Sequence, residues 1–382
     1  MELLILVLGL AIFLGAHSLK FLASGKRAGW IETLGERRFK GRLSLVSLLG
    51  LVLIGVGYAQ ARLAPVVVWV PPLPPLRYLG SDNELRDAAL CLALHEHGTK
   101  YRILRGPHLG SLVGQRVFLH IGQHLNPFGF TDYSAIWPYI IGELEEAGNT
   151  VFPSKHEAAL WENKAHMHRL FEARGVQAPT TELVPCCELE AFVQGRPFPF
   201  LLKEVHSCSS WGVHKVTSAA DVHKVVAAVS ARNPREIVLV QELLDMRRDL
   251  RAIVVGDEVV SHYWRINLAS EWKPTATGHG SRVDFGNFPE RWRGEIVGAL
   301  AKLGVRNGAF DVAWRGDNLE TEPLFLEVSP QYQPNPAVAE GELTGNYGEW
   351  KKAAQLGPAG YDWRFFDTLK AIARKYVKTT LG

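Results

Sequence analysis

The chain has 382 residues, of which 47% are hydrophobic and 21% charged, and its formal net charge is +3. This length allows two or three domains, and so small an excess of positive charge predicts no nucleic-acid partner. The four cysteines show no CxxC spacing, and no histidine-rich segment stands beside them. Neither a zinc site nor a disulfide scaffold is therefore expected, and a reducing compartment suits the chain.

Two apolar runs stand near the N-terminus, over residues 3–14 with a weak continuation to 19, and over residues 43–59. Each is near the lower limit of about 17 residues for a membrane span. Because neither run shows a polar face, we expect residues 1–62 to form a membrane-anchoring hairpin of two helices. A buried hairpin of a soluble protein is the alternative. Glu2 replaces the basic start of a signal peptide and no small-residue cleavage site follows, so a signal peptide is not expected.

This N-terminal stretch resembles a family of membrane proteins. Its segments Gly-Ala-His-Ser-Leu (15–19), Leu-Gly-Glu-Arg-Arg-Phe-Lys (34–40) and Gly-Leu-Val-Leu-Ile (50–54) look like the start of NnrU-type integral membrane proteins. The resemblance ends near Pro72, and the remaining spans of that family are absent. The segment is therefore interpreted as an anchor, and no activity of that family is carried over.

Prolines 65, 71, 72, 74 and 75 follow the second apolar run and predict an extended linker over residues 63–75. Residues 76–152 then have the pattern of a small α/β unit. Helices are expected over 85–97 and 136–147, and strands over 100–104, 116–121 and 149–152. His120, Gln123, His124 and Asn126 stand at the end of the 116–121 strand and just after it. Residues there bind ligands in many α/β sheets, and a polar surface loop is the alternative.

Residues 154–175 predict a helical segment with clear end signals. Ser154 is a typical N-cap, Glu157 stands three residues further on, and Gly175 is a typical terminator. A short apolar strand then delivers Lys203 at residues 200–204, and a run of small hydroxyl residues closes on Gly212. A nucleoside triphosphate requires this combination, a cation for its phosphates and a loop whose N–H and O–H groups surround them.

The remainder of the chain alternates strands and turns, which predicts an antiparallel sheet. Strands are expected over residues 237–244, 252–255, 258–260, 308–314 and 323–330. The last two strands each carry one acid in an apolar setting, Asp311 and Glu327. Buried carboxylates are costly unless they are paired or bind a metal. Two of them on adjacent strands would suit a Mg²⁺ ion that bridges phosphates.

This ordered series resembles the ATP-grasp superfamily of carboxylate–amine ligases, from about Leu76 to the C-terminus. The resemblance implies an α+β ATP-grasp fold over residues 153–382, preceded by an α/β pre-domain over 76–152. The loop end at 209–212 looks like the version found in D-alanine–D-alanine ligases. Two residues depart from the family pattern: Cys208 stands where glycine is usual, and Ser329 where a metal-binding asparagine is usual.

The resemblance also implies a role for individual residues. Two lysines and the small-residue loop would bind phosphates, a hinge would hold adenine, and an acid would bind ribose: Lys164, Lys203, Ser207, Ser209, Ser210, Gly212, Gln241, Glu242, Leu243 and Asp249. The metal ligands would be Asp311, Glu327 and Ser329. Arg251, Arg265 and Arg282 are candidates for holding phosphate or the substrate carboxylate, since guanidinium groups match both.

We therefore expect an ATP-dependent, ADP-forming ligase that joins a small-molecule carboxylate to an amine through an acylphosphate, with ATP and Mg²⁺ or Mn²⁺. Two alternatives remain open. The same fold serves small-molecule kinases, and the departures at Cys208 and Ser329 would suit a nucleotide-binding membrane protein without turnover. The sequence predicts neither the substrates nor the oligomeric state.

The charge pattern of the anchor conflicts with this function. Basic residues outnumber acids between the two apolar runs, which favours a cytoplasmic loop. A hairpin that crosses the membrane twice would then place the ligase domain outside, away from ATP. A hairpin that enters one leaflet, a segment lying in the interface, or a gene fusion would each remove the conflict. We give the ATP requirement more weight and expect a protein of the cell membrane with its ATP-grasp domain in the cytoplasm.

Overall fold

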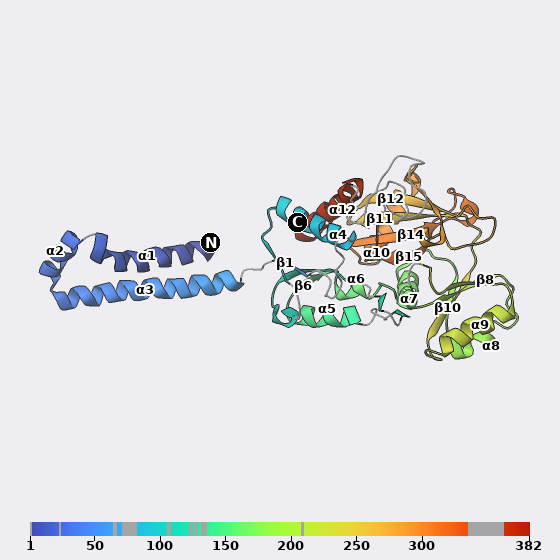
Figure 1. Cartoon of the computed structure of the whole chain (residues 1–382), viewed down its shortest axis with the longest axis horizontal. Coiled ribbons are helices and arrows are strands. Elements are labelled where there is room, and N and C mark those ends of the chain that lie inside the picture. The colour runs from blue at the N-terminus through green and yellow to red at the C-terminus, as the bar shows by residue number, and fades with distance from the viewer. Residues whose placement is uncertain are drawn as a thin grey trace. The chain divides into compact units, whose positions relative to one another are not determined.

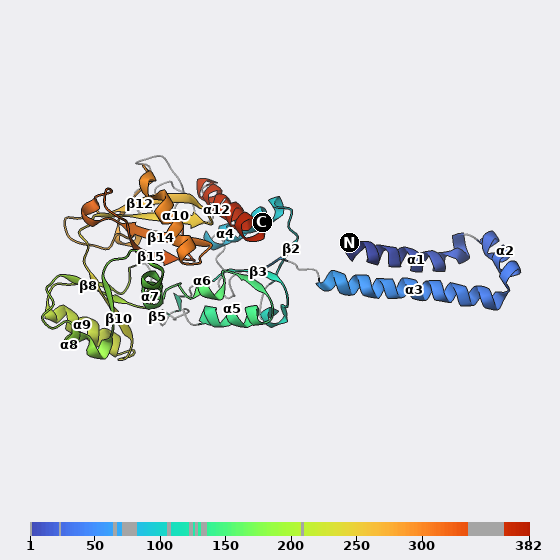
Figure 2. The same cartoon turned by 180° about the vertical axis from the view of Figure 1, so that it is seen from behind.

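The structure is a computed structural model that describes residues 2–22, 24–63, 67–70, 82–104, 108–121, 125–126, 129–130, 136–207, 210–334 and 363–382 (Figures 1 and 2). The chain divides into two compact units, Met1–Val66 and Val67–Gly382. The first is helical, and the second mixes helices with three sheets of four or five strands and one two-stranded sheet, β4 (Leu125–Asn126) with β5 (Gly129–Phe130).

Unit 1 is a helical hairpin in which α1 (Glu2–Leu22) packs along α3 (Glu36–Leu63), with the short α2 (Ser24–Leu34) between them (Figure 1). Glycines allow the two backbones to approach closely. A Cβ atom on Gly9 would lie 2.7 Å from the backbone nitrogen of Ile54, and one on Gly57 would lie 2.5 Å from that of Leu6. Small residues at such contacts are typical of helix packing in membranes.

The expected pair of membrane spans is not confirmed. Among the described residues, one helical segment, Glu36–Tyr58, is long and apolar enough to cross a bilayer. Among the described residues of α1, Ile5–Ser18 form a shorter apolar helical stretch.

Unit 2 begins with a parallel sheet in the order β2-β1-β3-β6, formed by β1 (Val67–Val70), β2 (Tyr101–Ile103), β3 (Arg116–Leu119) and β6 (Thr150–Phe152). The helices are α4 (Asp82–Glu96) and α5 (Ile136–Glu146). Strand β1 lies inside the expected linker of residues 63–75. It is a central strand, paired in parallel with both β2 and β3, and the prolines stand outside it. The subdivision expected at residue 152 stays a prediction.

The segment expected to be helical at 154–175 contains two helices, α6 (Lys155–Ala158) and α7 (Lys164–Arg174). Ser154 and Glu157 form the capping box that the sequence predicts, and Gly175 ends α7 with a left-handed φ of 63°. Between the helices Glu162 has a φ of 50°. This break sets the start of α7, so that Lys164 is its first residue and Asn163 its N-cap.

Two antiparallel sheets follow. The first has the order β7-β10-β8-β9, with β7 (Thr181–Pro185), β8 (Phe200–Glu204), β9 (Val213–Val216) and β10 (Ile237–Glu242), and α8 (Leu189–Phe192) and α9 (Ala219–Ser230) pack against it. The second has the order β13-β12-β11-β14-β15, with β11 (Arg248–Val255), β12 (Glu258–Ile266), β13 (Arg282–Asp284), β14 (Asn307–Ala313) and β15 (Leu324–Ser329).

The two faces of the five-stranded sheet have different partners. Alternate residues of β11, such as Leu250 and Ala252, pack in the main core with α7 and α10 (Arg293–Lys302). On the opposite face, Ile253 packs with Ile372 of the C-terminal helix α12 (Trp363–Leu381). Helix α12 also lies along α4, at one end of this face (Figure 2). The rest of that face carries the polar residues described next.

Candidate functional site

A row of charged side chains crosses three strands of the five-stranded sheet. Arg251 on β11 pairs with Asp311 on β14, and Asp311 pairs with Glu327 on β15. Asp249, two residues before Arg251, pairs with Arg265 on β12. Because directly paired residues and residues two apart point to one face of a sheet, these five side chains share a face. The antiparallel arrangement expected from the sequence therefore brings Asp311 and Glu327 side by side.

Two arginines hold Asp311. The guanidinium of Arg251 donates two hydrogen bonds to it, 2.7 Å to Oδ1 and 2.8 Å to Oδ2, and Nη2 of Arg265 lies 2.8 Å from Oδ2. Burial alone would raise the pKa of the Asp311 carboxyl, but the two guanidinium groups hold this pKa well below its usual range. Arg265 also donates two hydrogen bonds to Asp249, one of them 2.9 Å to Oδ1. In this structure the two arginines thus order the acids, and their contact with substrate stays a prediction.

The other two candidate metal ligands differ in their surroundings. The Glu327 carboxylate makes no hydrogen bond or ion pair with any residue that the structure describes. The Ser329 hydroxyl donates to the backbone oxygen of Gln331. Within the described parts of the chain, no three His, Cys, Asp or Glu residues are grouped as metal ligands. Glu327 is therefore the available carboxylate, and Asp311 is its charged neighbour.

Two lysines approach this face from other elements. The ammonium group of Lys203 on β8 interacts electrostatically with four other charged side chains. Three are the acids Glu327, Asp311 and Asp249, and the fourth is Lys164 at the start of α7. Burial, followed by repulsion from Lys164, lowers the pKa of Lys203 to about 8. Lys164 donates to the backbone oxygen and the hydroxyl of Ser207, the latter at 3.0 Å. A pair of cations held this close would favour a polyanion between them.

The small-residue loop after β8 is described only in part, since Cys208 and Ser209 lie outside the described residues. Ser207 is buried against Lys164. Ser210 and Gly212 have positive φ angles of 62° and 71°. A Cβ on Gly212 would lie 2.9 Å from the Cβ of Glu204, so the close return of the loop onto β8 requires glycine there.

The expected adenine hinge begins with the last two residues of β10. Gln241 is buried, and its amide donates to the Thr181 hydroxyl at 2.7 Å. Glu242 binds both terminal nitrogens of Arg315, at 2.7 Å and 2.6 Å, and these bonds lower the pKa of its carboxyl. Leu243 follows directly and is half-buried. The acid and the amide are thus held by side chains from neighbouring segments, which stiffens the hinge.

Arg282 is the one candidate arginine that the structure does not bring to the charged row. It lies on β13, with 43% of its side chain exposed and 3.9 Å from Asp284. Residue pairing places it opposite Ile266 at the end of β12. Its proposed contact with phosphate or carboxylate is not tested by this arrangement and stays a prediction.

Sequence reasoning missed His168. This histidine lies one helical turn after Lys164 on α7, with Nε2 3.5 Å from the amide nitrogen of Gln241. Burial, then repulsion from Lys203 and Lys164, lowers the pKa of His168 to about 3, so the ring is neutral at pH 7. The spacing of four residues on one helix face was a visible signal, because such pairs are neighbours on a helix.

Comparison with known proteins confirms both resemblances seen in the sequence. Residues 161–280 match the RimK-like ATP-grasp domain family, and residues 5–96 match the NnrU protein family. No curated protein matches the sequence. The structure resembles a RimK domain ATP-grasp protein from Sphaerobacter thermophilus DSM 20745, with 13% identity, 84% of this chain and 100% of that chain covered, and a TM-score of 0.51.

It also resembles the D-alanine–D-alanine ligase from Bacillus anthracis, with 10% identity, 82% of this chain and 99% of that chain covered, and a TM-score of 0.51. The same ligase complexed with ATP gives 10% identity, coverage of 82% and 98%, and a TM-score of 0.50. At these identities the likeness concerns the fold, and it confirms the expected ATP-grasp architecture.

Proposed function

We infer that this chain, whose residues 161–280 match the RimK-like ATP-grasp domain family, is an ATP-dependent ligase that joins a carboxylate to an amine. The observation that carries the inference is the convergence of two cations and two carboxylates from separate elements. Lys164 and Lys203 come from α7 and β8, and Asp311 and Glu327 from β14 and β15. Such a cluster is costly for the fold alone, and it becomes favourable when a metal-bound triphosphate lies between the two signs of charge.

The chemical problem is the approach of one anion to another. A carboxylate oxygen of the acid substrate attacks the γ-phosphorus, the bond from phosphorus to the bridging oxygen breaks, and ADP leaves. The amine nitrogen then attacks the acyl carbon, phosphate leaves, and the nitrogen loses a proton. Lys164 and Lys203 would offset the repulsion of the first step, since cations placed in advance cost no reorganisation during transfer.

The acids fit a magnesium ion that arrives with the nucleotide. Mg²⁺ is typically bound through one or two carboxylates together with substrate phosphates and water. Glu327 offers one such carboxylate, and Asp311 beside it offers a second that Arg251 and Arg265 keep ionised. When bound, the ion supplies positive charge to the phosphate oxygens. Ser329 would contribute only after its hydroxyl leaves the backbone oxygen of Gln331.

Binding of Mg-ATP is the first expected result. A ligand that binds only the native state, present at about 100 times its dissociation constant, adds about 2.7 kcal/mol to the free energy of unfolding. Thermal melting of the protein with ATP, Mg²⁺ and EDTA in all combinations would measure this effect. The melting temperature should rise with ATP and Mg²⁺ together and lose most of that rise with EDTA. A melting curve that ATP leaves unmoved in every combination would contradict nucleotide binding.

The reaction products separate the ligase from the two alternative functions. Phosphate release that requires both an acid and an amine identifies a ligase. ADP formation without free phosphate identifies a kinase, and ATP binding without turnover identifies a nucleotide-binding protein that has lost catalysis. A screen of amino acids and short peptides with ATP, read by a phosphate assay and an ADP assay in parallel, would distinguish the three.

The membrane is the proposed location of unit 1. Its helices expose many large apolar side chains, among them Leu8, Leu14, Leu45, Leu48 and Leu51. A soluble monomer rarely exposes so extended an apolar surface, whereas lipid would cover it. The match to NnrU proteins over residues 5–96 and the spanning length of Glu36–Tyr58 support the same location. Its use of ATP would place unit 2 in the cytoplasm.

Removal of unit 1 should release the protein from the membrane. The full chain is expected in the membrane fraction, and a chain of residues 67–382 in the soluble fraction, with its ATP response retained, because none of the candidate site residues lies before residue 67. Fractionation followed by immunoblotting measures this. Protease added to intact cells tests the orientation, since a cytoplasmic unit 2 should resist digestion until the cells are opened. Digestion from outside would contradict the proposed use of ATP.

A further inference from the structure

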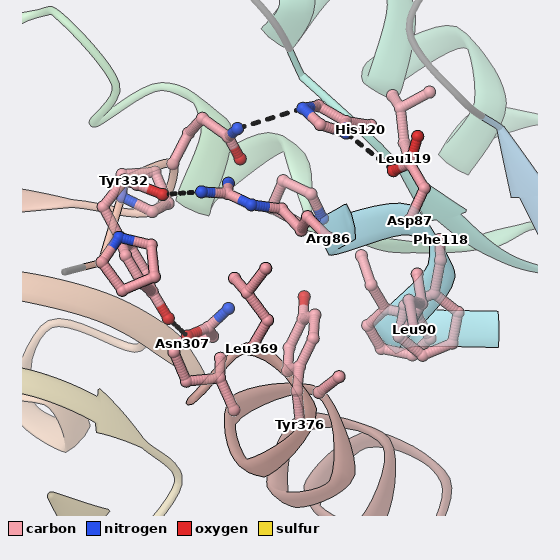
Figure 3. Close-up of a pocket in the computed structure, with 17 residues that line it drawn as sticks. Arg86, Asp87, Leu90, Phe118, Leu119, His120, Asn307, Tyr332, Leu369 and Tyr376 are labelled. Atoms are coloured by element: carbon pink, nitrogen blue, oxygen red, sulfur yellow. Dashed lines mark hydrogen bonds and ion pairs between the residues drawn. The ribbon is translucent and has the colours of Figure 1, made fainter. Parts of the chain in front are cut away.

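A cavity of about 100 Å³ lies beside the charged row, enclosed by α4, β3, α12 and the segment that follows β15 (Figure 3). Its wall is largely apolar and comes from parts of unit 2 that are distant in sequence: Leu90, Phe118, Phe152, Leu369, Ile372 and Ala373. Polar groups gather along one side, where Figure 3 shows Arg86, Asp87 and His120. The cavity is thus an apolar space with a polar rim.

The cavity and the charged row share one face of the five-stranded sheet. Ile253 pairs with Ala309, which pairs with Ser329, and this row lies two residues along the strands from Arg251, Asp311 and Glu327. Ile253 and Ala309 pack with Tyr332 and Ile372, which line the cavity. Two residues along a strand span about 7 Å. A molecule in the cavity could therefore extend to the carboxylates.

The polar rim is an ordered chain of contacts. His120 Nδ1 lies 3.0 Å from Asp87 Oδ1, and its Nε2 lies 3.2 Å from the side-chain nitrogen of Gln331 (Figure 3). An Nδ1–H that donates to Asp87 leaves Nε2 to accept from the Gln331 amide. The backbone oxygen of Gln331 in turn accepts from the Ser329 hydroxyl. The rim is thereby connected to the end of β15, which carries Glu327.

The hydroxyl of Tyr376 points from α12 toward the cavity in Figure 3. Burial raises the pKa of this phenol well above its usual value, so the hydroxyl keeps its proton and can donate a hydrogen bond. An engineered cavity of about 150 Å³ binds benzene, so this one suits a somewhat smaller group.

We propose that this cavity holds the apolar side chain of one of the two substrates, and that this substrate is an amino acid, free or at the end of a peptide, with a branched aliphatic side chain. The proposal rests on the proposed ligase function and specifies its substrate. The adjacent Arg86 and Asp87 supply charges of both signs at the rim, as the carboxylate and ammonium of an amino acid require.

Calorimetry tests the proposal. It measures the binding of leucine, phenylalanine and glycine to the detergent-solubilised full chain, with and without saturating Mg-ADP. Ala373 lines the cavity, whereas Ala371 on the same helix is exposed. Ala373→Leu should fill the cavity and weaken leucine binding at least about tenfold, since one methylene group discriminates by about 10- to 200-fold. Ala371→Leu is the matched control and should change nothing. Ile372→Val enlarges the cavity and should favour phenylalanine over leucine.

The outcomes distinguish this proposal from the ligase function. If leucine binds no better than glycine while Mg-ADP binds, the side-chain proposal is wrong and nucleotide binding stands. If Ala371→Leu weakens binding as much as Ala373→Leu, the ligand lies elsewhere. If hydrophobic amino acids bind as expected and Mg-ADP does not, the cavity assignment holds and the ligase function fails. Should Ala373→Leu lower the melting temperature strongly, Ala373→Val provides the smaller filling and the same comparison.

Discussion

Glu327→Gln is expected to lower ATP-dependent turnover by at least about 10²-fold and to leave the fold intact. The change keeps the shape of the side chain and removes one negative charge from the place where the metal-bound phosphates would lie. The Glu327 carboxylate makes no hydrogen bond or ion pair with the described residues, so the change leaves no hydrogen-bonding group of those residues without its partner. Phosphate release measures turnover, and thermal melting without ligand measures the fold.

Asp311→Asn should behave differently, although it is chemically the same substitution. Its carboxylate neutralises Arg251 and Arg265, and the amide would leave both guanidinium groups buried without their counter-charge. Breaking one side of a buried ion pair typically costs about 3–5 kcal/mol. The variant should therefore melt at a clearly lower temperature and also lose activity.

Asp284→Asn is the control for this pair of substitutions. Asp284 lies in the same sheet, but its ion pair with the half-exposed Arg282 is long, at 3.9 Å. Its substitution should therefore lower the free energy of unfolding by no more than about 0.5 kcal/mol. Full activity in Glu327→Gln would show that this carboxylate does not bind the metal. Equal melting temperatures for Glu327→Gln and Asp311→Asn would show that Arg251 and Arg265 do not need the negative charge of Asp311 for the stability of the fold.

Local rules predicted most of the elements on which this site is built. The capping box of Ser154 and Glu157 and the stop at Gly175 follow from residue types within one turn of a helix, and the structure contains both. The strands that carry Lys203, Asp311 and Glu327 follow from short β-branched or apolar runs. Such features depend on neighbours in the sequence, and a single chain displays them directly.

Features that depend on register or on distant segments were not accessible in the same way. Asp249 and Arg251 are visibly on one face of a strand, but only the pairing of β11 with β12 and β14 shows that Arg265 and Asp311 complete the cluster. Strand β1 was hidden among prolines because its partners, β2 and β3, come later in the chain. The cavity at α12 likewise combines segments more than two hundred residues apart, such as those of Leu90 and Ile372.

Lys203→Met is expected to stabilise the ligand-free protein and to abolish its response to Mg-ATP. The native environment lowers the pKa of Lys203 to about 8, chiefly through burial and then through Lys164, from its usual value of 10.5. A difference of this size corresponds to about 3 kcal/mol against the native state at neutral pH. Because the side chain is only half-buried, the expected gain is about 2 kcal/mol. Leu202→Met, at the neighbouring core position, should instead destabilise slightly and retain the ATP response.

The gain from Lys203→Met should also depend on pH in a defined direction. Between about pH 8 and pH 10.5 the unfolded chain binds a proton at Lys203 that the native chain has released. Stability of the wild type therefore rises with pH across this window relative to the variant. Below pH 8 Lys203 is protonated in both the native and the unfolded chain, and the full cost of burying its charge lowers the stability of the wild type. Above pH 10.5 Lys203 is neutral in both states, and this cost is absent. Melting of both proteins at pH 7 and pH 10 measures the change. A difference in melting temperature that is the same at both values would mean that Lys203 titrates normally, and the case for two cations held in advance for phosphate would lose its main physical support.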